Sequence, residues 1–275
     1  MENYNLIKKQ KIVSVVTVCW NAESMIRKTL DSVLEQDFDN YEYIIIDGDS
    51  KDSTLDIIYE YKDAFQKKNI NFFILSEPDN GIYDAMNKAL KYVTGKYTIY
   101  MNAGDCFLDK NILKDIFVED LNKYDIIYGD IYLFENNMYK YIKAGNITDR
   151  GDRSPICHQA VFTKTELLQL YKFDLSYKLA SDYDFLVKSY LEKKEFYYLN
   201  KAVSIFDFSG TSTKNSIGYL KEMHLIRLKF KFNSDVLFIS IFRLRIFDLL
   251  RNIIKFSLKH IFYSSFRGWE KEPSL

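Results

Sequence analysis

The stretch Lys96-Tyr-Thr-Ile-Tyr-Met-Asn-Ala-Gly-Asp105 is a short apolar run, rich in β-branched and aromatic residues, that stops at a polar loop. Its composition predicts a strand over Tyr97–Met101. Ligands of open α/β sheets bind just beyond the carboxyl ends of strands, so Asp105, with Asn102 beside it, lies where a metal-held phosphate would bind. An Asp after a strand is also an ordinary turn residue, so the meaning of this loop depends on the rest of the chain.

Two more acidic loops follow predicted strands. Asp47-Gly-Asp-Ser-Lys-Asp-Ser-Thr54 comes after a strand predicted at Tyr41–Ile46, and Glu77-Pro-Asp-Asn-Gly-Ile-Tyr-Asp-Ala-Met-Asn87 comes after one at Asn71–Leu75. A first strand is predicted at Ile12–Val18, and helices are predicted within 25–36, 53–65 and 82–92. This strict alternation predicts a parallel sheet covered on both faces, a Rossmann-like nucleotide-binding half.

The regularity changes after Asp105. Strands are predicted at Asp125–Asp130, Met138–Lys143 and His158–Phe162, followed by a helix at Tyr183–Leu191. This half is expected to form a mixed sheet. No linker rich in Gly, Ser or Pro separates the two halves, so we expect one continuous domain.

Composition narrows the class of protein. A chain of 275 residues that is 47% hydrophobic can bury a full core. Its 38 Lys and Arg residues balance its 38 Asp and Glu residues, so the net charge gives no sign of a nucleic-acid partner. The three Cys residues lack metal-ligand spacing and the first residues lack a signal-peptide core, so we expect a cytoplasmic protein with reduced thiols.

Five motifs occur in order along the chain: Val15-Val-Thr-Val-Cys-Trp-Asn21, the acidic loops at 47–54 and 77–87, Asn102-Ala-Gly-Asp105, and Ser181-Asp-Tyr-Asp184. Together they resemble family 2 glycosyltransferases of the GT-A type, most of all the branch that builds bacterial surface polysaccharides such as colanic acid. The resemblance covers roughly residues 11 to 210. It implies an α/β fold with a GT-A (Rossmann-like) mixed, mainly parallel sheet and helices on both faces. It also implies an inverting enzyme that moves a sugar from a nucleotide-sugar donor to a hydroxyl of a saccharide acceptor.

The same resemblance implies a nucleotide-binding set. Its members are Asp47, Asp49, Asp79, Asn80, Asn87 and Lys88. A carboxylate suits this role because it accepts hydrogen bonds from an imide N–H or from ribose hydroxyls. The loop at 47–54 is equally compatible with a turn that caps the next helix.

One family residue is missing from this set. The family has an Arg for phosphate contact where this chain has Met86, and Lys88 is the nearest substitute. Two aromatic residues, Trp20 and Tyr83, could stack on the base or the sugar, or could belong to the core.

The resemblance also implies a divalent metal, Mg²⁺ or Mn²⁺, held by Asp105 and Asn102. Such a cation neutralises the diphosphate as it departs. The chain departs from the family's Asp-x-Asp motif, which has acids at the positions of Asn102 and Gly104. One remaining carboxylate predicts a weak metal site that the phosphates of the donor complete.

The motif Ser181-Asp-Tyr-Asp184 matches the family's general-base motif and assigns the base to Asp182. A carboxylate becomes a competent base when partial burial raises its pKa and the acceptor hydroxyl lies within hydrogen-bond reach. Asp184 is the alternative base, and either residue could instead cap the helix that begins near Tyr183. His158 is a secondary site candidate on the acceptor side, or a structural histidine.

The last part of the chain has a different character. Between Val236 and Phe262, Phe, Leu and Ile are interrupted by a mainly basic polar stripe at a spacing of three or four residues. We therefore divide the chain into a GT-A domain at 1–220, with a donor half at about 11–105 and an acceptor half at about 106–220, and a basic amphipathic helical appendage at 221–275. Residues 234–263 would either contact the inner face of the cytoplasmic membrane, where a lipid-linked acceptor lies, or pack on the protein itself.

Two other functions compete with glycosyl transfer. A sugar nucleotidyltransferase is disfavoured because the segment after the first strand, Trp20-Asn-Ala-Glu-Ser, lacks the glycines and the Lys of a phosphate loop. A nucleotide-sugar-binding protein with a degenerate site would explain the altered Asp-x-Asp motif, but the retained Asp105 and Asp182 argue against it. The donor sugar and the acceptor are not encoded in any motif identified here.

Overall fold

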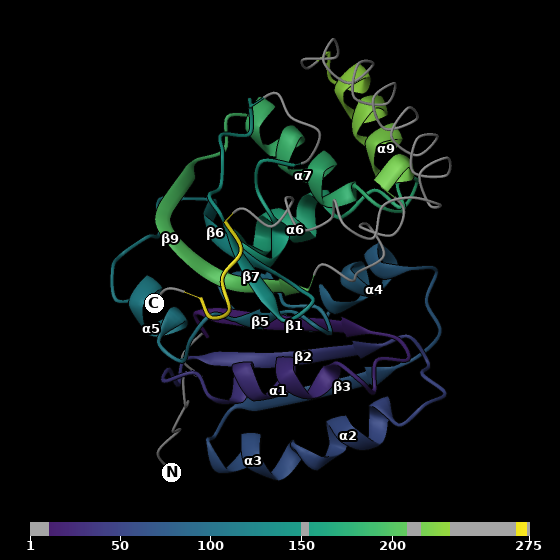
Figure 1. The fold of residues 1–275 in the computed structure, drawn as a ribbon, viewed down its shortest axis with the longest axis vertical. Helices are drawn as coiled ribbons and strands as arrows, with labels where there is room; N and C mark the ends of the chain where they lie inside the picture. Colours follow the sequence, from purple (N-terminus) through teal and green to yellow (C-terminus); the bar gives the residue numbers. More distant parts are fainter. Residues whose placement is uncertain (1–10, 150–153, 208–215, 232–267, 274–275) are drawn as a thin grey trace, which may run out of the picture.

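The structure, a computed structural model, describes residues 11–149, 154–207, 216–231 and 268–273. The first half alternates strands and helices as predicted (Figure 1). Its elements are β1 (Val13–Cys19), α1 (Ile26–Leu34), β2 (Tyr41–Asp47), α2 (Thr54–Glu60), α3 (Lys62–Lys67), β3 (Asn71–Ser76), α4 (Ile82–Ala89) and β4 (Tyr97–Tyr100). The second predicted helical segment is divided into α2 and α3 at Tyr61.

The second half contains more elements than the sequence predicted. They are β5 (Cys106–Phe107), α5 (Ile112–Phe117), β6 (Ile126–Glu135), β7 (Met138–Ile142), η1 (His158–Ala160), β8 (Val161–Lys164), α6 (Thr165–Tyr171), α7 (Ser181–Leu191), β9 (Phe196–Asp207) and α9 (Ser216–Lys229). The strand predicted at His158–Phe162 is partly wrong, because its first three residues form a 3₁₀ turn and β8 begins only at Val161. The long strand β9 was not predicted.

The described strands form one nine-stranded mixed sheet in the order β3-β2-β1-β4-β8-β6-β9-β5, with β7 paired to β6. Strands β3, β2, β1 and β4 are parallel, and their register places Cys19 opposite Asp47 and Asp47 opposite Ser76. Strand β8 runs antiparallel to both β4 and β6, whereas β6 and β9 are parallel. The carboxyl ends of the parallel strands therefore lie at a common edge of the sheet. Strand β8, between β4 and β6, joins this first half of the sheet to the second half.

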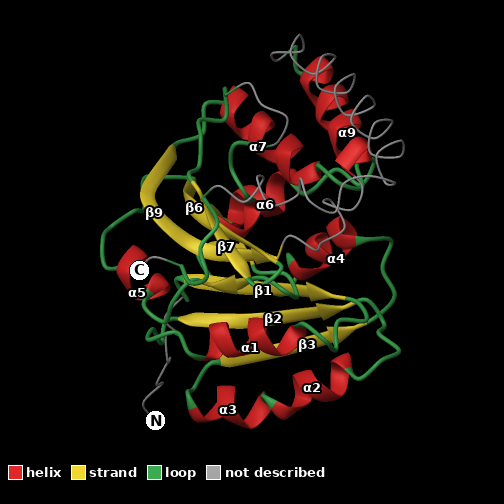
Figure 2. Cartoon of the chain, viewed as in Figure 1, coloured by secondary structure: helices red, strands yellow, loops and turns green. Residues whose placement is uncertain are grey.

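The sheet is covered on both faces, as predicted (Figure 2). Alternation along β1 sends Val13 and Val15 into the core beneath α1, α2, α3 and α5, and sends Val16 and Val18 into the core beneath α4, α6, α7 and α9. These valines are fully or almost fully buried, and burial of each such side chain contributes about 1.5 to 3 kcal/mol. The central strands are thus held from both sides, which keeps their carboxyl-end loops in fixed positions.

The helix α9 packs against α7. The Glu222 carboxylate accepts hydrogen bonds from the backbone N–H groups of Lys178, Leu179 and Ala180, which lead into α7. The predicted domain boundary at residue 220 falls inside α9. The predicted amphipathic segment at 234–263 lies outside the described residues.

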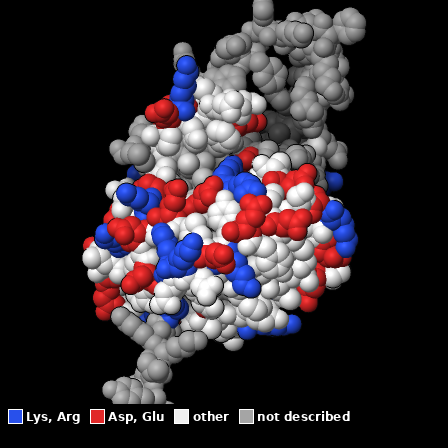
Figure 3. All heavy atoms as spheres, turned by 90° about the horizontal axis from the view of Figure 1, so that it is seen from below, with Lys and Arg blue, Asp and Glu red and all other residues white. Residues whose placement is uncertain are grey.

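The end of the chain returns to the sheet. Glu270 forms an antiparallel bridge with Tyr139 of β7, and Trp269 packs against the core beneath α1. Within the described ranges, no helix has both the length and the apolar character needed to cross a membrane. Acidic and basic side chains are interspersed on the face shown in Figure 3.

Candidate active site

Three loops at the carboxyl ends of β1, β2 and β3 meet at Gly48. A Cβ atom added to Gly48 would lie 2.4 Å from Oδ2 of Asp79 and 3.4 Å from Cβ of Trp20. A side chain at position 48 would therefore collide with Asp79, and glycine allows the loops to approach. The indole of Trp20 is 66% exposed beside them. Parallel strands of matched register bring these distant segments of sequence together.

The β2 loop is built around Asp47, whose side chain is fully buried. Its Oδ2 accepts hydrogen bonds from the Ser50 backbone N–H at 2.9 Å and from the Ser76 hydroxyl at 2.7 Å. Asp49 has a positive φ of 63° and its partly exposed carboxylate pairs with Lys51. Asp47 thus fixes the loop that presents Asp49, and a nucleotide-binding role for either residue stays a prediction.

The β3 loop contains the other predicted nucleotide residues. Oδ1 of the partly buried Asp79 accepts a hydrogen bond from the Gly81 backbone N–H at 2.8 Å, while Asn80 beside it is exposed. Lys88 Nζ lies 3.1 Å from Glu77 and 3.8 Å from Asp84, so neighbouring carboxylates already offset its charge.

Asn87 has a structural partner. Its amide donates to the carbonyl of Phe173 and accepts from the backbone N–H of Phe173, both at 2.9 Å. These bonds join α4 to the segment that precedes α7. Asn87 is therefore engaged in holding two parts of the site together, and its predicted contact with nucleotide stays a prediction.

The β4 loop places Asp105 in the interior. Its Oδ1 accepts a hydrogen bond from the backbone N–H of Asp207 at 3.0 Å, and its Oδ2 accepts one from Gln159 at 3.2 Å. Burial raises the pKa of Asp105 to about 6, although the charge of His158 and these hydrogen bonds act in the opposite direction. Gln159 and Asp207 were not predicted as site residues: of its segment only His158 was singled out, and Asp207 ends β9, a strand that the sequence did not predict.

Asn102 is the second predicted metal ligand. With its amide in the observed orientation, Oδ1 is buried and has no hydrogen-bond partner among the described residues. Such an orphaned carbonyl oxygen, in the same loop as Asp105, fits a hard divalent cation, which prefers oxygen ligands. Within the described ranges, no group of three His, Cys, Asp or Glu side chains is arranged to hold a metal.

Asp182 lies in the first turn of α7 and is largely buried, with Ala180 rather than either Asp at the N-cap position. Its Oδ1 accepts a hydrogen bond from the Tyr83 hydroxyl at 2.7 Å, and its Oδ2 lies 3.2 Å from Nδ1 of His158. Burial alone would raise the pKa of Asp182, but His158 and Tyr83 outweigh it and the pKa is lowered. Contrary to expectation, the raised pKa belongs to Asp105 and not to Asp182.

His158 connects the two ends of the site. A carboxylate only accepts hydrogen bonds, so Nδ1 carries the proton toward Asp182, and Nε2 lies 3.1 Å from the Asn102 amide nitrogen. The 3₁₀ turn η1 also supplies Gln159, which binds Asp105. The residues predicted as base and as metal ligands, although far apart in sequence, are thus joined by a chain of hydrogen bonds.

Asp184 faces away from this chain. Its carboxylate pairs with Lys229 of α9 at 2.8 Å, and its side chain is 8% exposed. Burial raises the pKa of Asp184, and the Lys229 ammonium only partly opposes this. Asp184 therefore serves the contact between α7 and α9, and the geometry favours Asp182 over it as a site residue.

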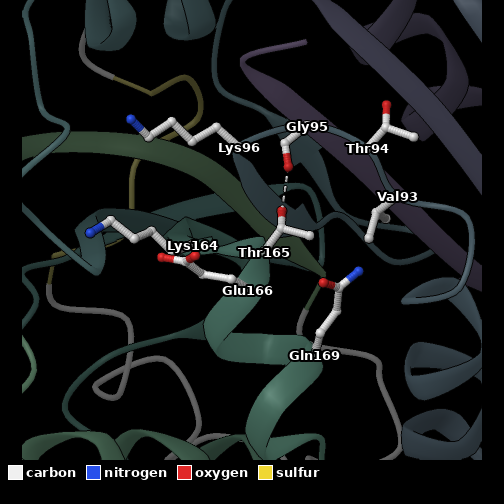
Figure 4. Close-up of a pocket in the computed structure, with 8 residues that line it drawn as sticks. All are labelled: Val93, Thr94, Gly95, Lys96, Lys164, Thr165, Glu166 and Gln169. Atoms are coloured by element: carbon white, nitrogen blue, oxygen red, sulfur yellow. Dashed lines mark hydrogen bonds between the residues drawn. The ribbon is translucent and has the colours of Figure 1, made fainter. Parts of the chain in front are cut away.

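A separate cavity of about 330 Å³ lies at the opposite, amino-terminal end of β4 (Figure 4). Thr165 in its wall bonds the carbonyl of Gly95, and the ammonium groups of Lys96 and Lys164 are paired with Asn122 and Asp125. The polar groups of this cavity are thus used within the fold. The loops at the carboxyl ends are the better candidate site.

The sheet and its acidic loops define a GT-A fold. The structure is similar to S. aureus TarS 1–349 in complex with UDP-GlcNAc, with a TM-score of 0.63, 21% identity, and coverage of 82% of this chain and 67% of that one. It is also similar to the mannosyltransferase PcManGT from Pyrobaculum calidifontis in complex with GDP-Man and Mn²⁺, with a TM-score of 0.61, 16% identity, and coverage of 84% and 68%. Against a longer TarS chain, this chain spans 40% of the length.

The chain belongs to glycosyl transferase family 2, whose family model matches residues 14–180. A PGL/p-HBAD biosynthesis glycosyltransferase of Mycobacterium bovis is 27% identical over 180 residues, which are 64% of this chain and 69% of that protein. The UDP-Glc:alpha-D-GlcNAc-diphosphoundecaprenol beta-1,3-glucosyltransferase WfgD of Escherichia coli is 28% identical over 139 residues, or 50% of this chain and 53% of WfgD. The predicted family and fold class are therefore confirmed.

Proposed function

We propose that this protein is an inverting glycosyltransferase of bacterial surface polysaccharide biosynthesis, which moves a sugar from a nucleotide-sugar donor to a hydroxyl of a saccharide. One observation carries the proposal: the buried carboxylate of Asp182 is linked through His158 to Asn102 in the loop of Asp105. This network would hold the proton acceptor close to the loop that we propose for the leaving diphosphate. Both are required for transfer from a nucleotide sugar.

In the proposed reaction, the loops around Gly48 seat the nucleotide, with Trp20 against the base and Asp49 and Asp79 accepting hydrogen bonds from it. Asp182 takes the proton of the acceptor hydroxyl. The acceptor oxygen forms a bond to the anomeric carbon while the bond from that carbon to the diphosphate oxygen breaks. The bonding electrons leave with the nucleoside diphosphate, and the configuration at the anomeric carbon is inverted.

Asn102 and Asp105 would hold a divalent cation, Mg²⁺ or Mn²⁺, through the orphaned amide oxygen and the neighbouring carboxylate. The cation supplies charge neutralisation for the departing diphosphate. The PcManGT complex with Mn²⁺ supports this proposal for a protein of similar fold. Because the chain offers one carboxylate in this loop, we expect the donor phosphates to complete the coordination.

We further propose that the acceptor is lipid-linked. The name of WfgD specifies a diphosphoundecaprenol acceptor, and the basic, apolar stretch at 234–263 suits contact with an anionic membrane surface. The full chain should then sediment with vesicles of anionic lipid at low salt and be released in part at high salt, because screening weakens the electrostatic attraction. Equal binding to neutral vesicles, or none to anionic ones, would contradict membrane contact.

A donor screen tests the enzymatic proposal. The full chain is incubated with a panel of UDP-, GDP- and TDP-sugars, with Mg²⁺ or Mn²⁺, and with short saccharide acceptors in soluble and lipid-linked form. We expect release of a nucleoside diphosphate that requires the acceptor and is lost with Asp182→Asn. Formation of a nucleotide sugar from a sugar phosphate and a nucleoside triphosphate would instead indicate a nucleotidyltransferase, and donor binding without turnover would indicate a binding protein.

A further inference from the structure

Tyr83 holds an unusual position for a core aromatic residue. It lies in the first turn of α4, directly after the β3 loop, and its side chain is buried. Its ring contacts Phe173 with a centroid distance of 5.5 Å, and its hydroxyl lies 2.7 Å from Oδ1 of Asp182. A buried tyrosine hydroxyl requires an acceptor, and here the acceptor is the carboxylate assigned as the base.

The two oxygens of Asp182 have different donors on different elements. Tyr83 of α4 binds Oδ1, and His158 of η1 lies at Oδ2. Two bonds, one to each oxygen, restrict the rotation of the carboxylate group more than one bond alone would. Burial and the charge of Asp182 raise the pKa of Tyr83 well above its ordinary value, so the hydroxyl keeps its proton and acts as a donor throughout the physiological range.

Tyr100 shows what a tyrosine with only a packing role does in the same core. It is buried, its ring also lies 5.5 Å from that of Phe173, and its hydroxyl donates to the backbone carbonyl of Met86 at 3.0 Å. A backbone carbonyl is sufficient to satisfy a buried hydroxyl. Tyr83 differs from Tyr100 in that its hydrogen bond orients an ionised side chain of the site.

We propose that Tyr83 is a positioning residue for Asp182, whose hydroxyl holds the carboxylate in the orientation that receives the acceptor proton. This inference rests on the proposed function. Because Tyr83 follows Asp79 and Asn80 by only a few residues, the same short segment would contribute both to the nucleotide loop and to the orientation of the base. Binding of the donor and orientation of the base would then both depend on the first turn of α4.

The test compares Tyr83→Phe with Tyr100→Phe in the full chain. Each variant removes one buried hydroxyl from the same core, so both should lose thermal stability, and Tyr83→Phe should lose more because its partner is charged. Tyr83→Phe should lower kcat by on the order of 10- to 100-fold, the effect expected of one hydrogen bond to a charged group, with donor KM within about twofold of wild type. Tyr100→Phe should keep its kcat.

A pH profile separates positioning from packing. The titratable side chains that face Asp182 are Tyr83 of α4 and His158 of η1, with Tyr219 of α9 in electrostatic reach of Tyr83. Loss of a donor to the charged form should move the acidic limb of the kcat profile to higher pH in Tyr83→Phe. Replacement of Tyr83 by 3-fluorotyrosine keeps the ring and makes the hydroxyl a stronger donor, so it should move the acidic limb to lower pH. This variant provides the test if Tyr83→Phe does not fold.

Three results would overturn the inference: an unchanged kcat in Tyr83→Phe, equal losses in the two Phe variants, or an acidic limb that moves in neither Tyr83 variant. Asp182→Asn distinguishes this outcome from failure of the proposed function. If Asp182→Asn is inactive and Tyr83→Phe is fully active, only the role of Tyr83 is wrong. If Asp182→Asn is fully active, the base assignment itself is wrong and the inference is lost with it.

Discussion

Replacement of Asp182 by Asn should separate catalysis from folding. Asn retains one oxygen for the Tyr83 hydroxyl and presents its amide toward Nδ1 of His158. That nitrogen can accept the bond when the ring proton moves to Nε2 and the Asn102 amide turns its oxygen toward Nε2. The variant should therefore fold, with a loss of about 1 to 2 kcal/mol in the free energy of unfolding from the missing charge-assisted hydrogen bond. Turnover should fall by about 10²- to 10⁴-fold, or about 3 to 5 kcal/mol in the barrier, because an amide cannot take the acceptor proton.

Asp184→Asn is the matched control, two residues along the same helix. Burial raises the pKa of Asp184 and the Lys229 ion pair only partly offsets it, so neutralisation should change stability by no more than about 1 kcal/mol. Its kcat should remain within about threefold of wild type, because its carboxylate pairs with Lys229 of α9, which is not one of the proposed site residues.

The assay is nucleoside diphosphate release at saturating acceptor, with donor affinity measured by calorimetry and stability by thermal unfolding. Asp182→Asn should bind donor nearly as tightly as the wild type, since the base acts on the acceptor. The assignment of Asp182 as the base is wrong if Asp182→Asn keeps most of its turnover or if Asp184→Asn loses more turnover than Asp182→Asn. It is also wrong if weaker donor binding accounts for the loss of turnover in Asp182→Asn.

Three further predictions follow from the structure. The pKa of Asp105 is raised to about 6, so ionisation of Asp105 should lower the free energy of unfolding by at most about 3 kcal/mol as the pH rises from about 4 to about 6. Mn²⁺ should therefore raise the unfolding temperature more at pH 7.5, where Asp105 is ionised, than at pH 5. Equal shifts at the two pH values would contradict metal binding by Asp105. Trp20→Ala should weaken nucleoside diphosphate binding by about tenfold or more while leaving stability within about 0.5 kcal/mol, as calorimetry and thermal unfolding can measure, and unchanged affinity would remove the stacking role. Deletion of residues 268–275 removes the bridge from Glu270 to Tyr139 at the edge of β7 and the packing of Trp269 on the core. The deletion should lower the unfolding temperature and promote association, which light scattering can measure. A stable monomer would show that the fold does not need these contacts.

Part of the predicted appendage at 221–275 lies within the described residues. A domain cut at residue 220 would end within α9, whose Glu222 binds three backbone N–H groups ahead of α7. These contacts attach the first part of the predicted appendage to the segment that leads into α7. Sequence alone could not show this, because an amphipathic pattern is the same whether the apolar face meets lipid or protein.

The first half of the fold was predictable because its information is local. Runs such as Val13–Cys19 and Tyr41–Asp47 are mostly apolar and are buried at every position, since both faces of a central parallel strand are covered. Helical spacing between such runs then determines the alternation. The acidic loops could be located from the same pattern, because they follow directly on each strand.

The second half was less predictable because its pairing is not local. Strand β9 lies parallel to β6, about 70 residues earlier in the chain, and its aromatic and charged residues show no clean alternation. His158 was expected in a strand, but it occupies a 3₁₀ turn whose contacts to Asn102 and Asp182 depend on three separate elements.

The sequence by itself determined the class of fold, the family, and which carboxylates stand in its motifs, because each depends on short patterns within one segment. Only the tertiary structure decided what those carboxylates do. Asp182 and Asp184 are alike in sequence, yet one meets Tyr83, 99 residues away, and the other meets Lys229, 45 residues away. Their pKa values move in opposite directions because the partners and the burial of a charge are set by packing, and packing joins residues that no local pattern relates.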